Sequence, residues 1–363
     1  MSIPARPALA FVLLAILSAC TALAQEQAHV FRGATIYPIA TSPVENGVLV
    51  IRAGKILAVG RDVRIPRNAV EHDVSGKVIL PGLVDTHSHI GRVEGGDASA
   101  PLHPGVRTLD AIDVQHHSIK RARAGGITTV NVMSGSGHLM SGQTAYLKLR
   151  DGRIIDDLLF CADPIRDVCG GMKMANGTNS IRSEAGAFPG TRARSAALAR
   201  QLFVDALTYR EEIKRAEDDP EKKVTRDIGK EALLEVLEGK RIVHFHTHRH
   251  DDVLTVLRLK EEFGFRVVLH HVSEAWKVAD EIAAAGVPAS IIILDSPGGK
   301  LEAVDMKWEN GAALEQSGVD IAYHTDDSIT ESRLFLRSAA LGVRAGLSRE
   351  KALEAVTLAG ARM

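Results

Sequence analysis

Residues 78–91 read Val-Ile-Leu-Pro-Gly-Leu-Val-Asp-Thr-His-Ser-His-Ile-Gly. The apolar and β-branched residues of this stretch predict a buried strand. His87 and His89 lie two residues apart near the end of that strand. Because side chains alternate along a strand, both imidazoles leave on the same side. They can bind one metal ion there, or they can be two histidines on a solvated turn.

The segment Pro81–His89 resembles the first-strand motif of the amidohydrolase superfamily, whose members are metal-dependent hydrolases and deaminases. Later segments resemble its imidazolonepropionase-like and prolidase-like branch, and the similarity runs from about Val30 to the end of the chain. The resemblance implies an α/β fold, a (β/α)8 TIM barrel with a small flanking β-sandwich domain. It leaves the substrate open, because one barrel carries many chemistries.

The length and composition fit this expectation. The chain has 363 residues, enough for a barrel plus an accessory domain, and its hydrophobic content of 45% supplies a large core. Lys+Arg 44 against Asp+Glu 45 leaves a net charge of −1, so nothing attracts nucleic acid. We expect a small-molecule substrate, and the oligomeric state stays open, with a homo-oligomer as one option.

Residues 1–24 have the layout of a secretory signal peptide, with Arg6 followed by an apolar run from Ala8 to Leu17. Cleavage after Ala24 predicts an exported protein, periplasmic or secreted. Residues 17–20 also resemble a bacterial lipoprotein box, in which Cys20 is lipidated and anchors the protein to a membrane. In an oxidising compartment Cys161 and Cys169 can form a disulfide, although two unpaired buried thiols fit equally well.

The N-terminal β-sandwich segment is expected at residues 28–77, with short strands at Val30–Tyr37, Gly47–Ile51 and Lys55–Val59. The resemblance implies further sandwich strands from the C-terminus. The sequence stops within the helical stretch that normally precedes them, so we expect those strands to be missing. The barrel is then residues 78–363, truncated at its C-terminus.

From Val78 onward, strand-like and helix-like runs alternate, a pattern that predicts βα units and a parallel sheet. The expected barrel strands are Val78–Thr86, Ile127–Met133, Thr144–Leu149, Met172–Ala175, Ile242–Thr247, Arg266–His271, Ala289–Leu294 and Asp320–His324. A long insertion, Asn176–Lys240, contains an amphipathic helix predicted at Ser195–Glu217.

The barrel fold places active-site residues at the carboxyl ends of strands. His246 resembles the metal ligand of the fifth strand, and we expect His244 below it to be a core histidine. On the sixth strand His271 shares a face with Val267 and Leu269, which favours it over His270 as the ligand. His248 and Arg249 would then lie at the rim, where we predict that they bind substrate.

The eighth strand leads to Asp326, which resembles the aspartate of the superfamily that binds metal and relays the catalytic proton. We expect its neighbour Asp327 to be a solvated loop carboxylate. In binuclear members a carboxylated lysine bridges two cations, and Lys173 on the fourth strand resembles it, with Lys148 as the rival. The expected ligands are His87, His89, Lys173, His246, His271 and Asp326, holding one or two divalent metals, with Zn²⁺ as the expected ion.

This ligand set predicts a hydrolase that cleaves an amide or peptide C–N bond of a small molecule, such as a dipeptide or an N-acyl amino acid. The alternatives are a deaminase or cyclic-amide hydrolase of the same superfamily, and a metal-binding barrel without activity. The His-x-x-Glu of the superfamily's deaminases is missing, because Thr247 and Arg249 lie three residues past His244 and His246.

Overall fold

The structure is a computed structural model that describes residues 27–93, 95–182, 188–217, 219, 221–293 and 300–363. The chain divides into two compact units, which meet in sequence between Pro81 and Gly82. The predicted leader, residues 1–24 with Cys20, lies outside the described residues.

The described part of the first unit forms one five-stranded sheet. Its strands are β1 (His29–Ile36), β2 (Val44–Arg52), β3 (Lys55–Gly60), β4 (Val70–Asp73) and β5 (Val78–Ile79). The three strands expected from the sequence correspond to β1, β2 and β3, which pair antiparallel, while β4 and β5 run parallel to β1. Alternate residues of β1 and β2, such as Val30 and Val50, are buried in its apolar core.

The predicted first barrel strand, Val78–Thr86, is in fact two strands in different units. Val78 and Ile79 pair with β1, and a new strand, β6 (Leu83–Ser88), begins the second unit. The break falls at Pro81, which has no backbone N–H to donate, and Gly82. A Cβ atom at Gly82 would lie 2.1 Å from the Thr128 hydroxyl oxygen, so the chain passes there only because this residue has no side chain.

The described part of the second unit is a mixed α/β structure with two sheets. The strands after β6 are β7 (Ile127–Val132), β8 (Met140–Gln143), β9 (Ala145–Lys148), β10 (Met172–Ala175), β11 (Val243–Thr247), β12 (Val267–His271), β13 (Ala289–Ile291) and β14 (Ile321–Tyr323). The five strands β10 to β14 pair in sequence order and are all parallel, as predicted, and β6 is parallel to β7. Leu294, the predicted end of the seventh strand, lies outside the described residues.

The third predicted strand, Thr144–Leu149, departs from the expected parallel pattern. Its residues form β9, which is antiparallel to β7, and the preceding β8 is antiparallel to β10. The reason is the short link from Met133 to Leu139. A parallel connection needs a crossover of about a dozen residues or more, whereas a short link can only bring the chain back in the opposite direction.

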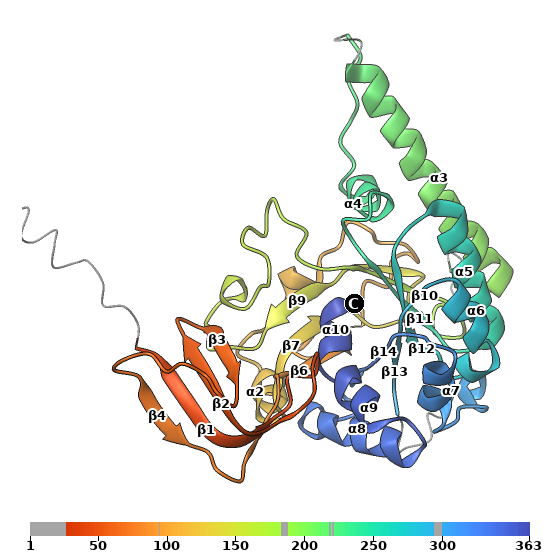
Figure 1. Ribbon diagram of the computed structural model, residues 1–363. Coiled ribbons are helices and arrows are strands. Elements are labelled where there is room, and N and C mark those ends of the chain that lie inside the picture. The colour runs from red at the N-terminus through yellow and green to blue at the C-terminus, as the bar shows by residue number, and fades with distance from the viewer. Residues whose placement is uncertain (1–26, 94, 183–187, 218, 220, 294–299) are drawn as a thin grey trace, which may run out of the picture. The chain divides into compact units, whose positions relative to one another are not determined.

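The helices of the second unit follow its strands (Figure 1). They are α2 (His117–Ala124), α3 (Arg192–Glu217), α4 (Ile228–Leu237), α5 (His250–Phe263), α6 (Ala279–Ala284), α7 (Asn310–Gln316), α8 (Phe335–Arg344), α9 (Arg349–Ala355) and α10 (Leu358–Arg362). The helix predicted in the long insertion is α3, which starts at Arg192. Figure 1 shows α3 extending away from the strands with α4 beside it.

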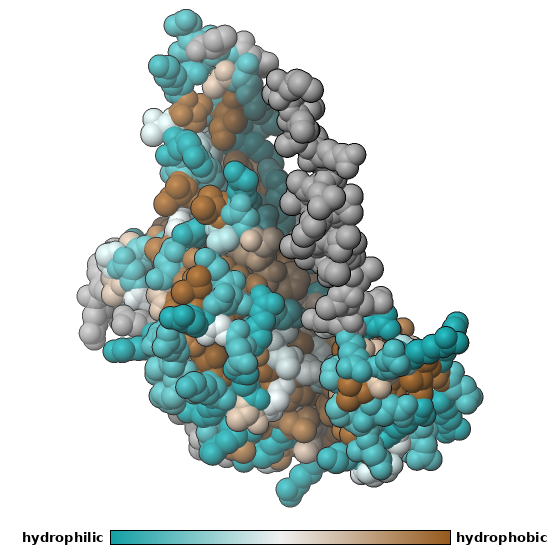
Figure 2. Space-filling view, turned by 90° about the vertical axis from the view of Figure 1, so that its left-hand side faces the viewer, coloured by the Kyte–Doolittle hydropathy of each residue, from teal (hydrophilic) through white to brown (hydrophobic). Residues whose placement is uncertain are grey.

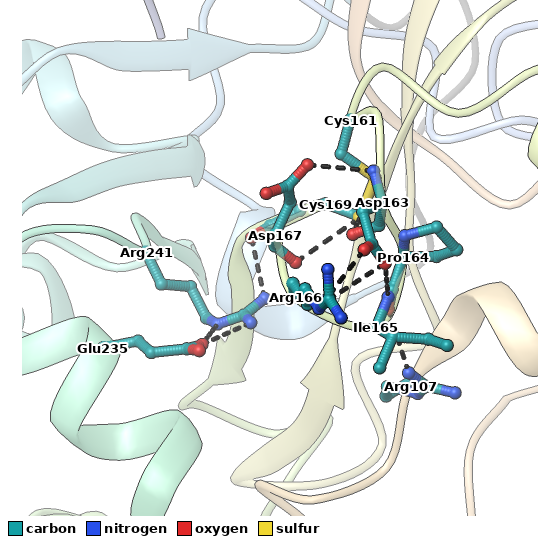
Figure 3. Close-up of a disulfide and its surroundings, with 11 residues drawn as sticks. Arg107, Cys161, Asp163, Pro164, Ile165, Arg166, Asp167, Cys169, Glu235 and Arg241 are labelled. Atoms are coloured by element: carbon teal, nitrogen blue, oxygen red, sulfur yellow. Dashed lines mark hydrogen bonds and ion pairs between the residues drawn. A yellow bond between two sulfur atoms is a disulfide. The ribbon is translucent and has the colours of Figure 1, made fainter.

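The loop between β9 and β10 is closed by a disulfide between Cys161 and Cys169 (Figure 3). The sequence had left this pairing and two free thiols as equal options, and the structure has the pairing. Inside the loop the Asp163 amide donates to Asp167 at 2.9 Å, and Arg107 donates to the Pro164 carbonyl at 3.3 Å. The disulfide thus closes a loop that its own hydrogen bonds already order.

The surface drawn in Figure 2 is mainly hydrophilic, with apolar residues interspersed rather than gathered in one continuous area. Within the described part of the chain, no helix is both long enough and apolar enough to span a bilayer.

Candidate metal centre

The predicted ligands meet at the carboxyl ends of the parallel strands. His87 lies near the end of β6, Lys173 in β10, His246 in β11 and His271 at the end of β12. Asp326 follows β14, and its amide donates to the His87 carbonyl at 2.9 Å, which ties the last strand to the first. Asp326 and His271 have φ values of 48° and 69°, in the left-handed region. Such strained conformations cluster at functional sites.

His87, His89 and Asp326 form the first group of candidate metal ligands. The Nδ1 atom of His89 donates to the Met133 carbonyl at 2.7 Å, so in the neutral ring Nε2 carries a lone pair. That Nε2 lies 2.9 Å from Asp326 Oδ1, and His87 Nε2 lies 3.5 Å from the same oxygen. Burial raises the pKa of Asp326, but His89, His324 and Lys173 together more than offset this effect and hold the pKa below its usual value. The group therefore offers lone pairs and a negative charge to a cation.

A second group consists of His246, His248 and His271, whose nitrogens also lie within 4.8 Å of one another. All three rings are buried. Neither nitrogen of His246 has a hydrogen-bond partner among the described residues, and the same is true of Nε2 in His248 and His271. Burial, as the main cause, lowers the pKa of each ring far below its ordinary value, so all three are neutral at pH 7. Neutral imidazole is the form that binds metals.

Lys173 is fully buried, with its ammonium nitrogen 3.2 Å from His87 Nε2 and 3.3 Å from the Met133 sulfur. Burial lowers its pKa to about 7, although the charge of Asp326 acts in the opposite direction. The rival residue Lys148 donates instead to the Thr129 hydroxyl at 3.0 Å and lies over the ring of Phe160. Of the two lysines, Lys173 is the one in contact with a candidate ligand.

Below these groups a chain of hydrogen bonds supports His87. The Tyr146 hydroxyl lies 2.8 Å from His244 Nε2, and His244 Nδ1 lies 2.9 Å from His270 Nε2. His270 Nδ1 in turn lies 3.3 Å from His87 Nδ1, which leaves His87 Nε2 facing Asp326. His244 is therefore a hydrogen-bonded core histidine, as predicted, and His270 orients His87, a candidate ligand.

A crystal structure of an amidohydrolase from Thermotoga maritima MSB8 is 32% identical in sequence with a TM-score of 0.85, and the match covers 92% of this chain and 88% of that one. The chain belongs to the amidohydrolase superfamily. The resemblance first noticed in Pro81–His89 is thereby confirmed.

Curated relatives agree with this membership over shorter parts of their lengths. Amidohydrolase tasK from Hapsidospora irregularis is 27% identical over 82% of this chain, and an imidazolonepropionase from Paracoccus denitrificans is 42% identical over 57 residues, or 15% of this chain. The chain spans 33% of the length of the first and its match spans 14% of the second. No family model matches the chain.

The residues predicted at the rim lie in unequal settings. His248 directly follows β11, is only 7% exposed and belongs to the second ligand group, and its contact with substrate stays a prediction. The Ser273 hydroxyl lies 2.7 Å from His248 Nδ1, and this buried hydrogen bond fixes the orientation of the ring. Arg249 is partly exposed, and its guanidinium donates to Asp251 at 2.7 Å and 2.9 Å. A substrate carboxylate would have to compete with Asp251 there.

The interpretation of Asp327 as a solvated carboxylate is also wrong. This side chain is buried, and it accepts hydrogen bonds from Arg121 at 2.7 Å and from the Ser332 amide at 2.9 Å. The Arg121 charge, from α2, compensates the burial of the carboxylate. Asp327 therefore fixes the loop that carries Asp326.

Sequence reasoning did not single out His324 or Lys300. His324 Nε2 lies 3.1 Å from His271 Nδ1, and its other nitrogen lies 2.7 Å from the Ser290 hydroxyl. Its position one residue past β14 was an available signal, because that is a strand carboxyl end. Lys300 precedes the turn Leu301–Ala303, and its charge helps to lower the pKa of His246 and His248, so it faces the site. It follows residues 294–299, which are not described.

Proposed function

We propose that this chain is a metal-dependent hydrolase that cleaves an amide or peptide C–N bond in a small molecule, on a (β/α)8 barrel. The observation that carries the proposal is the meeting of His87, His89 and Asp326 with a buried lysine and further imidazoles whose nitrogens have no partner among the described residues. Buried polar atoms are normally hydrogen bonded, so these buried nitrogens fit the binding of a metal ion.

The side chains fit one or two divalent metal ions, and neutral imidazole and carboxylate ligands suit Zn²⁺. His87, His89 and Asp326 would hold one ion, with His246 and His271 holding a second. Lys173, whose pKa of about 7 leaves much of the amine neutral, would bridge them as a carbamate. A bound ion would polarise the carbonyl of the substrate and lower the pKa of a water molecule.

Asp326 supplies the proton transfer in this proposal. Its lowered pKa keeps it ionised at neutral pH, so an oxygen of its carboxylate can accept the proton of the attacking water. The same carboxyl can then donate that proton to the leaving nitrogen. The bond from the Asp326 amide to the His87 carbonyl holds the carboxylate beside the imidazoles during both steps.

The test of this function is Lys173→Ala, with Lys148→Ala as the matched control. Lys173→Ala is expected to lower the metal content measured by elemental analysis and to abolish amide cleavage, with partial rescue by a short carboxylic acid. Lys148→Ala, whose amine contacts Thr129, is expected to keep both. A fully active Lys173→Ala protein, or the reverse pattern, would refute the assignment.

The substrate proposed is a dipeptide or an N-acyl amino acid, whose free carboxylate a cation at the mouth would bind. Arg249 is the candidate, because it lies two residues past the carboxyl end of β11, the strand that carries His246. A substrate carboxylate would take the place of Asp251 in the bidentate pair with its guanidinium. Arg249→Ala should raise KM for substrates with a free carboxylate and leave KM for the corresponding amides unchanged. Equal turnover of the two substrate sets by the wild type would overturn this preference.

We further propose export, with residues 1–24 as a removable leader. A disulfide between Cys161 and Cys169 supports it, because disulfides persist in oxidising compartments such as the bacterial periplasm. Mass spectrometry of the mature protein from a bacterial host would find an N-terminus at Gln25, or at a lipidated Cys20 in the anchored alternative. An intact Met1 in material from the cytoplasm would contradict export.

A further inference from the structure

His248 has the features of a metal ligand rather than of a substrate contact. Its Nδ1 lies 2.7 Å from the Ser273 hydroxyl, while its Nε2 is buried and has no partner among the described residues. The ring packs edge-on against His246 with centroids 4.7 Å apart, and it stacks on His271 at 5.1 Å. One of its nitrogens is within 4.8 Å of a nitrogen of each neighbour.

We propose that His246, His248 and His271 form a three-imidazole site for a divalent transition metal, which binds its ion without needing the carbamate of Lys173. This inference rests on the proposed metal-dependent function and adds His248 to its ligands. The chemical class of the ion follows from the donors. Imidazole nitrogens suit Zn²⁺, Co²⁺ and related ions, whereas Mg²⁺ prefers carboxylate, carbonyl and water oxygens.

Ser273 is the residue that positions His248 in this site. A metal-binding histidine usually makes a hydrogen bond through its other ring nitrogen, and that bond fixes the orientation of the ring. Ser273 is buried, just after β12, the strand that carries His271. The segment from His271 to Ser273 therefore supplies both a proposed ligand, His271, and the hydroxyl that orients His248.

The two ligand groups also differ in charge, so a substitution can weaken metal binding at one group and leave the other group unchanged. The first group contains the carboxylate of Asp326, whereas the second contains imidazoles only. The second group therefore leaves the charge of a bound ion uncompensated and relies on three nitrogen donors. Losing one of three neutral donors should weaken that position strongly and leave the carboxylate position intact.

The experiment titrates the metal-free full-length protein with Co²⁺, whose visible absorption reports its ligands, and counts bound Zn²⁺ by elemental analysis. His248→Phe keeps the size and burial of a ring but removes the donor nitrogen. His250→Gln is the matched control, because His250 is two residues away and pairs with Glu274 instead. Circular dichroism and melting of each variant verify the fold.

We expect His248→Phe to lose one of two bound ions, or to bind it at least tenfold more weakly, with a changed Co²⁺ spectrum. Ser273→Ala should weaken the same ion by about tenfold, as found for other groups that orient metal-binding histidines. His250→Gln should match the wild type. Lys173→Ala should keep the ion held by the three histidines. If His248→Phe does not fold, Ser273→Ala decides.

The proposal is overturned if His248→Phe, or Ser273→Ala where it decides, binds the same number of ions with wild-type affinity and an unchanged spectrum. It is also overturned if Mg²⁺ displaces the second ion as readily as Zn²⁺ does. Its failure is distinct from failure of the proposed function. If the wild type binds the ion through His248 but cleaves no amide, the proposed hydrolase function is wrong and the proposed metal site still holds.

Discussion

Two pairs of histidines on the same strands behave in opposite ways. His244 and His270 lie lower on β11 and β12, and every ring nitrogen of this pair has a neighbour within hydrogen-bond distance. His246 and His271 lie higher on the same strands. Three of their four ring nitrogens are buried and have no hydrogen-bond partner among the described residues: His246 Nδ1, His246 Nε2 and His271 Nε2. Two histidines on one strand can therefore have different roles. The hydrogen-bond partners of each ring, rather than the strand that carries it, indicate whether it supports its neighbours or is available to bind a metal.

The free-energy consequence of this difference is large. A buried polar atom without a hydrogen bond costs about 1–3 kcal/mol, so we expect the upper pair to contribute less than the lower pair to the stability of the metal-free protein. A bound metal ion would coordinate these nitrogens, and the removal of this free-energy cost would contribute to its affinity. The upper pair is thus suited to a ligand, and the lower pair is suited to holding the ring of His87 in place.

The largest expected effect comes from Asp326→Asn, in the upper part of the site. The amide keeps the shape and much of the metal binding, but it cannot accept the proton of the attacking water. We expect kcat to fall by about 10²–10⁴-fold, the usual contribution of general acid–base catalysis. Steady-state kinetics on an amide substrate with metal-replete protein measures this. Activity within about tenfold of the wild type would remove Asp326 from the mechanism.

The next effect compares one histidine from each pair. His244→Phe leaves the Tyr146 hydroxyl and His270 Nε2 buried without partners, so we expect a loss of about 2–5 kcal/mol in the free energy of unfolding. His246→Phe removes two nitrogens that have no partner, so the metal-free protein should be no less stable, while metal affinity falls. Urea unfolding of both metal-free variants gives the comparison. Equal losses would show that the two pairs do not differ.

The sequence predicted the upper part of the site better than its surroundings. Alternation along a strand was enough to choose His271 over His270, because Val267, Leu269 and His271 share one face of the strand. The core position expected for His244 did not follow from alternation, which puts His244 on the same face as His246. The resemblance placed Lys173 ahead of Lys148, and the structure puts Lys173 beside His87. These inferences needed only the strand and its position in the order.

What the sequence could not predict depends on contacts between distant segments. Asp327 is buried because Arg121, far away in the chain, pairs with it. His248 turns inward because Ser273, on the loop after the next strand, binds its ring. The reversed direction of β8 and β9 is a partial exception, since the shortness of the link before Met140 was visible in the sequence.

The smallest expected effect, and the sharpest test of the lower pair, is Tyr146→Phe. The change removes only the hydroxyl that contacts His244 Nε2 at 2.8 Å and leaves that nitrogen buried without its partner. We expect the free energy of unfolding to fall by about 1–3 kcal/mol, with metal content unchanged.

The matched control for Tyr146→Phe is Tyr323→Phe, because the Tyr323 hydroxyl is also buried but has no partner among the described residues. Removing that hydroxyl deletes an unsatisfied atom, so stability should hold or rise slightly. Chemical denaturation of the two variants side by side isolates the hydrogen bond from the loss of an oxygen atom. If the free energy of unfolding falls by the same amount in both variants, the hydrogen bond from Tyr146 to His244 does not stabilise the lower pair. The proposed difference between the two pairs of histidines would then be wrong for the lower pair.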